Sequence, residues 1–452
     1  MTDRKKMLLA VMASGAGSHI AAWRHPQTNA AAGVSIADHV AMAQLAERGL
    51  FHMYFVADTP AARTSKLDMY SRMPMFMNQL EPLTLLSALA VTTRHIGLGG
   101  TVSASFYEPY NLARQFASLD QISGGRSAWN IVTSANDFAA QNFGLDKLPP
   151  HGDRYKRADE FTDIVLKLWD TWEDDAFIRD KESGFSFDTT KQHAVHHEGP
   201  YFKIHGALNV QRSPQGRPII IQAGASDAGM DFAAKVAEII FGANETPAES
   251  RAFYDQLKSR MLKFGRSTEE LRLLAGMPVI LGESEQEAED KYQTLQALIH
   301  PDVGRARLGM DLEADLSGLP LDEPVPEELI PATANFHKKF YDNIVAMIRV
   351  EKLTLRQMYL RYERGRRTLR GSPVQIADAL EEWHSAGACD GFMMMFPMLQ
   401  DGLGLFVGKV VPELQRRGLL RTEQDGVTLR DQLGFPRPPH PAALKSPEQA
   451  AE

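Results

Sequence analysis

The sequence of 452 residues contains a single cysteine, Cys389, and no long apolar run. One cysteine excludes an intramolecular disulfide and a zinc site built from several cysteines. The first residues, MTDRKKMLLAVM, include too few consecutive apolar side chains for a signal peptide or a membrane span. The formal net charge is −8, and no long basic block stands out. We therefore expect a cytoplasmic protein that binds neither nucleic acid nor a membrane.

Several catalytic signatures are also absent from the sequence. The chain has no G-x-G-x-x-G and no Walker sequence, which argues against a Rossmann dinucleotide site and against nucleotide hydrolysis. It has no G-x-S-x-G, so a serine nucleophile of the hydrolase type is disfavoured.

The chain instead alternates short apolar segments with amphipathic helices. Strands with apolar residues on both faces, separated by helices, are typical of a parallel sheet covered on both sides. Eight such segments favour a (β/α)8 TIM barrel of the α/β class, formed by a single domain over 1–452. The expected strands are 7–12, 51–57, 96–103, 127–132, 218–222, 239–241, 273–281 and 391–396. Two long stretches, 172–217 and 300–370, do not fit the alternation, and we expect both to be insertions over the C-terminal, catalytic face.

Polar residues follow the first two expected strands, where barrel enzymes carry their reactive groups. His19 belongs to the sequence SHIAAWRHP at 18–26, and an imidazole there suits proton transfer or hydrogen bonding. The alternative is a packed loop whose imidazole caps backbone groups. Asp58 comes directly after the second strand and either orients the polar edge of a substrate or heterocycle, or caps the next helix.

The third and fourth strands end in small polar side chains. The third carries Thr101 and Ser103 after two glycines, and the fourth has the sequence WNIVTS, with Asn130 and Ser134. The glycines allow close approach to the backbone, and the hydroxyls supply small donors. Glycine at a barrel bend is the structural alternative.

The strongest general signal is PIIIQAGASDAG at 218–229, in which a buried strand turns through glycine and serine into a helix. Free N–H groups and the positive end of the helix dipole would meet at Ala223, Gly224, Ala225 and Ser226. This pattern predicts a site for one phosphate, as on a mononucleotide. The alternative is a purely structural turn. Within HGDRY at 151–155, ahead of a periodic helix expected at 158–169, His151 and Tyr155 would add donors.

Two further features are ambiguous. His193 and His197 stand four residues apart, but the stretch lacks helical periodicity, so we predict no metal site. The 300–370 stretch is rich in basic residues, which suits either an anionic substrate, a solvated face or a subunit contact. These residues are His337, Lys338, Lys339, Arg361, Arg364, Arg366, Arg367 and Arg370.

With these segments the chain resembles the flavin-dependent monooxygenases of the bacterial luciferase-like superfamily. The branch is that of nitrilotriacetate monooxygenase component A and dibenzothiophene-sulfone monooxygenase. The resemblance rests on SHIAAWRHP, YFVADTP at 54–60, the segment 101–134, HGDRYKRADEF at 151–161, PIIIQAGASDAG and VVPELQRRGL at 410–419. A related alkane monooxygenase has a histidine after its VVTS-like sequence, where this chain has Ala135, which disfavours alkane hydroxylation.

The resemblance implies a two-component enzyme that receives FMNH2 from a separate NAD(P)H:flavin reductase. O2 is the co-substrate, and a C4a-(hydro)peroxyflavin would oxygenate a small organic substrate, often with C–N or C–S cleavage. Carried over by position, Asp58, Thr101 or Ser103, and Ser134 would lie near the flavin ring and ribityl chain. His151, Tyr155 and the 223–226 turn would hold the phosphate.

His19, Asn130 and Ser134 are the candidate catalytic residues of this interpretation. A homodimer or homotetramer is expected. The alternatives are a deazaflavin-dependent oxidoreductase on the same fold and a non-catalytic flavin-binding relative.

Overall fold

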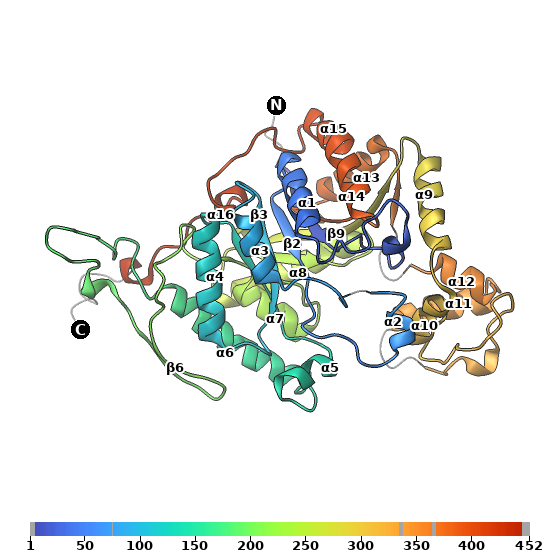
Figure 1. The fold of residues 1–452 in the computed structure, drawn as a ribbon, viewed down its shortest axis with the longest axis horizontal. Coiled ribbons are helices and arrows are strands. Elements are labelled where there is room, and N and C mark those ends of the chain that lie inside the picture. The colour runs from blue at the N-terminus through green and yellow to red at the C-terminus, as the bar shows by residue number, and fades with distance from the viewer. Residues whose placement is uncertain (1–4, 75, 334–337, 364–367, 445–452) are drawn as a thin grey trace.

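A closed barrel of eight parallel strands forms the centre of the molecule, in a computed structural model that describes residues 5–74, 76–333, 338–363 and 368–444 (Figure 1). The strand order runs β11-β1-β2-β3-β4-β7-β8, and β9 pairs with both β8 and β11 to close the ring. The (β/α)8 prediction is confirmed, and all eight expected strands are present. They are β1 Leu8–Ala13, β2 Met53–Val56, β3 Gly97–Ser103, β4 Ser127–Val132, β7 Ile219–Gln222, β8 Ile239–Gly242, β9 Arg272–Leu281 and β11 Gly391–Met395.

The strands are buried on both faces because alternate side chains enter two different apolar clusters. On β1, Leu8 and Ala10 point into the barrel, whereas Leu9 and Val11 pack against the surrounding helices. The amino-terminal end of the barrel is closed by the segment around α16 (Leu429–Gln432), whose Leu429 joins the interior cluster.

Helices surround the barrel as expected from the alternation (Figure 1). The outer helices are α1 Ile36–Arg48, α3 Pro82–Ala90, α4 Pro109–Ser123, α6 His151–Trp169, α7 Asp227–Val236, α8 Pro247–Met261, α9 Glu285–Ala297, α13 Pro373–Ser385, α14 Leu399–Leu405 and α15 Val411–Arg416. The helix expected at 158–169 begins earlier, at His151. His151 and Tyr155 are therefore residues of its first turns, and the prediction that they precede the helix is wrong. The exposed, polar start of α6 gives no apolar periodicity, which explains the error.

The insertion at 300–370 packs on the loops at the carboxyl ends of the strands. It contains α10 Pro301–Leu312, α11 Lys338–Arg349, α12 Leu355–Arg361 and the short strand β10 Leu369–Gly371, which extends the sheet beside β9. Its apolar cluster includes Ala21 from the loop after β1, and Met69, Tyr70 and Met73 from the segment after β2. This insertion lies over the face formed by the carboxyl ends of the strands, as predicted.

The stretch 172–217 lies elsewhere, along the outer side of α4 and α6. It contains the antiparallel hairpin β5 Val195–Glu198 and β6 Lys203–Gly206 (Figure 1). Gln121 on α4 donates to the carbonyl of Arg212, and Glu160 on α6 bonds His197 of the hairpin. The expectation of an insertion over the catalytic face does not hold for this segment, because it follows a helix that runs back toward the amino-terminal ends of the strands. That the whole chain is one domain stays a prediction.

Across the part of the chain that the structure describes, no helix combines the length and the apolar character needed to traverse a lipid bilayer.

Candidate active site

A cavity of about 370 Å³ opens at the carboxyl ends of β11, β1 and β2, which we call the cavity side of the barrel mouth. Its walls come from the loop after β1, from the segment 73–79 and from the ends of β2 and β11. Among the described lining residues, His19 is the sole titratable side chain. The described walls are therefore largely apolar and uncharged. The lining includes Met12, Ser14, Ser18, His19, Ile20, Trp23, Ala57, Met73, Phe76, Asn78, Gln79 and Met395.

Glycine shapes the loop after β1 where it passes the loop after β11. Gly17 has φ +153, and a Cβ built there would lie 2.0 Å from the carbonyl oxygen of Pro397. The Ser18 N–H donates to the carbonyl of Phe396 at 2.9 Å. Only glycine permits this close approach, which fixes the cavity wall.

His19 is held by two hydrogen bonds from its ring. The Nδ1 atom accepts from the Ala21 N–H at 3.1 Å, and Nε2 lies 2.8 Å from Oε1 of Gln296 on α9. Burial lowers the pKa of His19 to about 4, and the charge of Arg307 acts in the same direction, while the Gln296 hydrogen bond opposes them. The imidazole is therefore neutral at physiological pH.

Asp58 and Gln79 meet at the edge of the cavity. Nε2 of Gln79 donates to Oδ1 of Asp58 at 2.9 Å. Burial raises the pKa of Asp58, and the nearby Glu81 adds to the rise. The next helix, α2 (Leu67–Tyr70), begins well after Asp58, so the helix-capping alternative is wrong.

The carboxyl ends of β3, β4 and β7 form what we call the polar side of the mouth. Thr101 and Ser103 face the barrel interior, because Leu98 and Val102 pack among the outer helices. Asn130 pairs in register with Thr101, and its Nδ2 donates to Oγ1 of Thr101 at 2.9 Å. Both side chains are buried, and Oδ1 of Asn130 has no hydrogen-bond partner among the described residues. A buried acceptor without a partner is costly, which marks this atom for a ligand.

Ser134 extends the polar side just beyond β4. Its hydroxyl lies 2.7 Å from that of Ser103, and its backbone has φ 53, in the left-handed region. Arg154 of α6 donates to the Ser134 carbonyl and thereby holds this unusual backbone in place.

The turn at 223–226 lies beside the start of α6, as the sequence suggested. Ser226 caps α7 and accepts from the Gly229 N–H at 3.2 Å, and His151 Nε2 lies 3.4 Å from the Ser226 hydroxyl. A Cβ at Gly224 would lie 2.9 Å from the Tyr155 hydroxyl. His151, Tyr155, Gly224 and Ser226 thus surround the N-terminus of α7, an arrangement suited to an anion.

No local sequence pattern indicates a role for Gln79 or Gln296. Their importance comes from hydrogen bonds to residues 21 and 277 positions away along the chain, Asp58 and His19.

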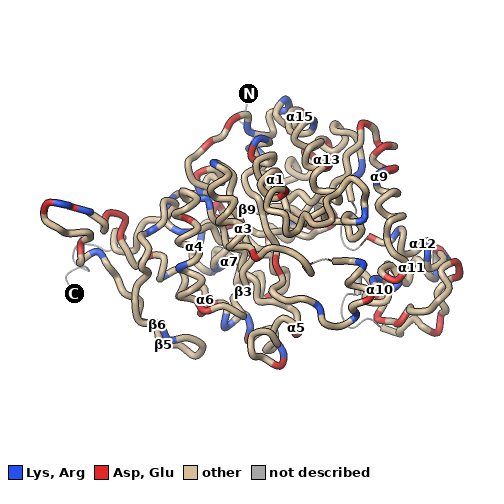
Figure 2. Tube along the Cα trace, in the orientation of Figure 1, with Lys and Arg blue, Asp and Glu red and all other residues tan. Residues whose placement is uncertain are grey.

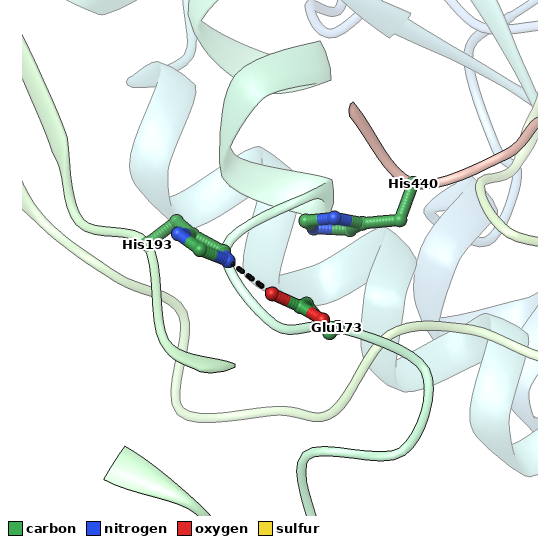
Figure 3. A group of neighbouring side chains, drawn as sticks. All are labelled: Glu173, His193 and His440. Carbon is green, nitrogen blue, oxygen red and sulfur yellow. Dashed lines mark hydrogen bonds and ion pairs between the residues drawn. The ribbon is translucent and has the colours of Figure 1, made fainter. Parts of the chain in front are cut away.

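The histidines considered for a metal lie in two separate places. His197 bonds Glu160 at 2.9 Å, whereas His193 bonds Glu173 at 2.8 Å near His440 (Figure 3). The His440 ring donates from Nε2 to the carbonyl of Asp170 and accepts at Nδ1 from the Ala442 N–H. Both ring nitrogens are therefore occupied, and the bond to Asp170 attaches the C-terminal segment to the end of α6.

Charges of both signs alternate over the 300–370 insertion (Figure 2). Arg361 pairs with Glu351, and Arg370 lies 3.3 Å from Glu289. Of the predicted basic cluster, His337, Arg364, Arg366 and Arg367 lie outside the described residues, as do the side chains of Lys338 and Lys339. The described arginines of this cluster are therefore neutralised locally.

Comparison with known proteins assigns the family. The model of the luciferase-like monooxygenase family matches residues 17–389. The chain belongs to this family. It is 44% identical to nitrilotriacetate monooxygenase component A of Aminobacter aminovorans, over 99% of this chain and 100% of the relative. It is 38% identical to a dibenzothiophene-sulfone monooxygenase of Rhodococcus erythropolis, over 96% of this chain and 98% of the relative.

A solved structure shares the fold over nearly the whole length. Riboflavin lyase RcaE, crystallised with modified FMN and riboflavin, superposes with a TM-score of 0.81 at 28% identity, covering 97% of this chain and 99% of that one. The resemblance inferred from the sequence is thus confirmed, and with it the assignment to a family of flavin-dependent monooxygenases.

Proposed function

We propose that this chain is the oxygenase of a two-component system that uses FMNH2 and O2 to oxygenate a small organic substrate. The observation that carries the proposal is the pairing of an uncharged cavity with a separate polar side at one barrel mouth. A flavin mononucleotide needs both, since its phosphate requires donors and its ring a dry, shaped site.

The described residues fit FMN. The phosphate would bind at Ala223, Gly224, Ala225 and Ser226, with His151 and Tyr155 as side-chain donors, at the positive end of α7. Thr101, Ser103, Ser134 and Asp58 would contact the ring and ribityl chain. The relation to a structure that contains modified FMN supports this choice of flavin.

Bound reduced flavin supplies the activation of O2, and the protein positions the reactants and excludes water. Oδ1 of Asn130 would accept from an N–H or O–H at the reacting centre, and Ser134 would donate its hydroxyl. His19 is a neutral group at the cavity wall. Because His19 lines the cavity, its ring would contact the substrate while it keeps the hydrogen bond to Gln296.

The cavity favours a substrate whose reacting part is uncharged. Moving a carboxylate from water into a site without a cation costs several kcal/mol. Among the described lining residues there is no lysine or arginine. This composition suits a thioether, sulfone or other neutral group better than a tricarboxylate, although the chain resembles an enzyme named for nitrilotriacetate as well as one named for a sulfone. For sulfur and amine substrates, we expect C–S or C–N cleavage.

The partner implied is a cytoplasmic NAD(P)H:flavin reductase that supplies FMNH2 transiently, and the oxygenase is proposed to be a homodimer or homotetramer. Its relative is likewise named as one component of a larger enzyme.

The test is an assay that combines the chain with a flavin reductase, NADH, FMN and ¹⁸O2. The substrate panel pairs neutral sulfides and sulfones with carboxylated analogues of equal size. We expect one ¹⁸O atom in a product or released fragment, dependent on O2 and reductase, with the neutral members favoured. Turnover without O2 on a reduced deazaflavin, or tightly bound FMN that is redox-silent, would instead support one of the two alternatives.

A further inference from the structure

Gln296 is a buried glutamine that the proposed reaction does not use, yet it contacts both the cavity wall and the 300–370 insertion. Its side chain lies one residue before the end of α9 and is 3% exposed. All its polar atoms are bonded. Oε1 faces Nε2 of His19 at 2.8 Å, and Nε2 donates to the carbonyl of Leu360 on α12 at 2.6 Å and to the Tyr292 hydroxyl at 2.7 Å.

The direction of each bond follows from what each partner can do. The Leu360 carbonyl can only accept, so the amide nitrogen of Gln296 must face it and Oε1 must face His19. The His19 Nε2 atom must then carry the proton, while Nδ1 accepts from the Ala21 N–H. The ring is therefore a neutral imidazole protonated at Nε2.

We propose that Gln296 is a positioning residue that holds His19 uncharged against the cavity wall and joins that wall to helix α12 of the insertion. A shift of α12 would move the Leu360 carbonyl, and with it the amide that orients His19. The positioning of His19 by Gln296 does not depend on which reaction the protein catalyses. The expected effect of Gln296 on product formation rests on the proposed function.

Charged groups surround this network on three elements. Arg307 on α10 acts electrostatically on His19. Behind Gln296, the Tyr292 hydroxyl bonds the Glu363 carboxylate, and the Arg370 guanidinium lies 4.0 Å from the centre of the Tyr292 ring. A charge introduced at position 296 would lie among buried polar groups. Its interaction with His19 would therefore be only weakly screened by solvent.

The direct test is nuclear magnetic resonance of the full chain labelled with ¹⁵N-histidine, with His19→Gln used to assign the signal. We expect a neutral ring from pH 6 to 8, protonated at Nε2 and bare at Nδ1. An imidazolium at pH 7, or a proton on Nδ1, would overturn the proposal without any reference to activity.

Two variants with a matched control extend the test. Gln296→Glu places a carboxylate against the His19 N–H and should raise the midpoint of its titration by about one pH unit or more. Gln293→Glu adds the same charge to an exposed position of α9 and should leave the midpoint unchanged. Equal midpoints in Gln296→Glu and the unaltered chain would refute the role.

Gln296→Met keeps the length but removes the hydrogen bonds. We expect product formed per NADH to fall about tenfold, as loss of a buried hydrogen bond suggests, with FMN affinity unchanged within about twofold. Unchanged coupling with normal FMN binding would contradict the positioning role. If the unaltered chain oxygenates nothing, the proposed function fails, and the resonance experiment still decides the state of His19.

Discussion

The cavity side and the polar side of the barrel mouth differ in how far apart along the chain their residues lie. On the polar side, the 223–226 turn directly follows β7, and Thr101 and Asn130 stand on neighbouring strands. On the cavity side, His19 depends on Gln296, and Gln296 in turn on Leu360. The proposed cofactor site thus consists of short local segments, whereas the proposed substrate site is assembled from a loop after a strand and a distant insertion.

The first prediction tests the cavity side through its titratable residue. The pKa of His19 is lowered from about 6.5 to about 4, so between these values the unfolded chain binds more protons than the folded one. Stability should rise with pH across this window, and the loss on acidification should reach roughly 3 kcal/mol near pH 4. In His19→Gln, the free energy of unfolding by urea should depend less on pH between pH 4 and 7.

His25→Gln, in the same loop, is the control for this experiment and should lose stability on acidification as the unaltered chain does. An identical pH dependence in His19→Gln and the unaltered chain would show that the ring is not buried in the neutral form.

The second prediction concerns the polar side. A methyl group at Gly224 would lie 2.6 Å from Nε2 of Gln222 and 2.9 Å from the Tyr155 hydroxyl. The methyl group would displace the Tyr155 hydroxyl, one of the proposed phosphate donors. Loss of a hydrogen bond to a charged group costs about 2 kcal/mol, so Gly224→Ala should weaken FMN binding about 30-fold in a fluorescence titration. Gly404→Ala, where a Cβ meets nothing within 4 Å, should bind FMN normally. Equal FMN affinities for the two variants would show that the 223–226 turn does not bind FMN.

The third prediction separates the two sides. Ile20 lines the cavity and packs against the cluster of the insertion. Ile20→Lys should raise KM for a neutral substrate about tenfold or more, because the ammonium group must be desolvated, and should leave FMN affinity unchanged. Ile20→Met keeps the wall apolar and should change KM little. A parallel loss of FMN affinity in Ile20→Lys would mean that the two sides are one site.

The smallest expected effect is at the hydroxyl pair of the polar side. Ser103→Ala removes the partner of the Ser134 hydroxyl at 2.7 Å, and a single neutral hydrogen bond contributes about 1 kcal/mol. FMN affinity should fall about fivefold, while KM for substrate stays the same. A change confined to KM would show that Ser103 contacts the substrate and not FMN.

The same contrast explains what could be predicted from the sequence. The strands were predictable because their residues are apolar on both faces, and the 223–226 turn because a strand, a glycine turn and a helix follow one another. The hairpin of 195–206 was missed because VHHE and KIHG are half exposed and lack a strong apolar pattern. Gln79 and Gln296 were missed because hydrogen bonds between distant residues leave no mark on local sequence.

The most direct test of the account is a crystal structure of the chain with FMN bound. We expect the phosphate at the N-terminus of α7, within hydrogen-bond reach of Ser226, His151 and Tyr155, and the flavin ring directed toward Asn130 and the cavity beyond it. A phosphate bound elsewhere, with the 223–226 turn making no contact to it, would contradict the central claim.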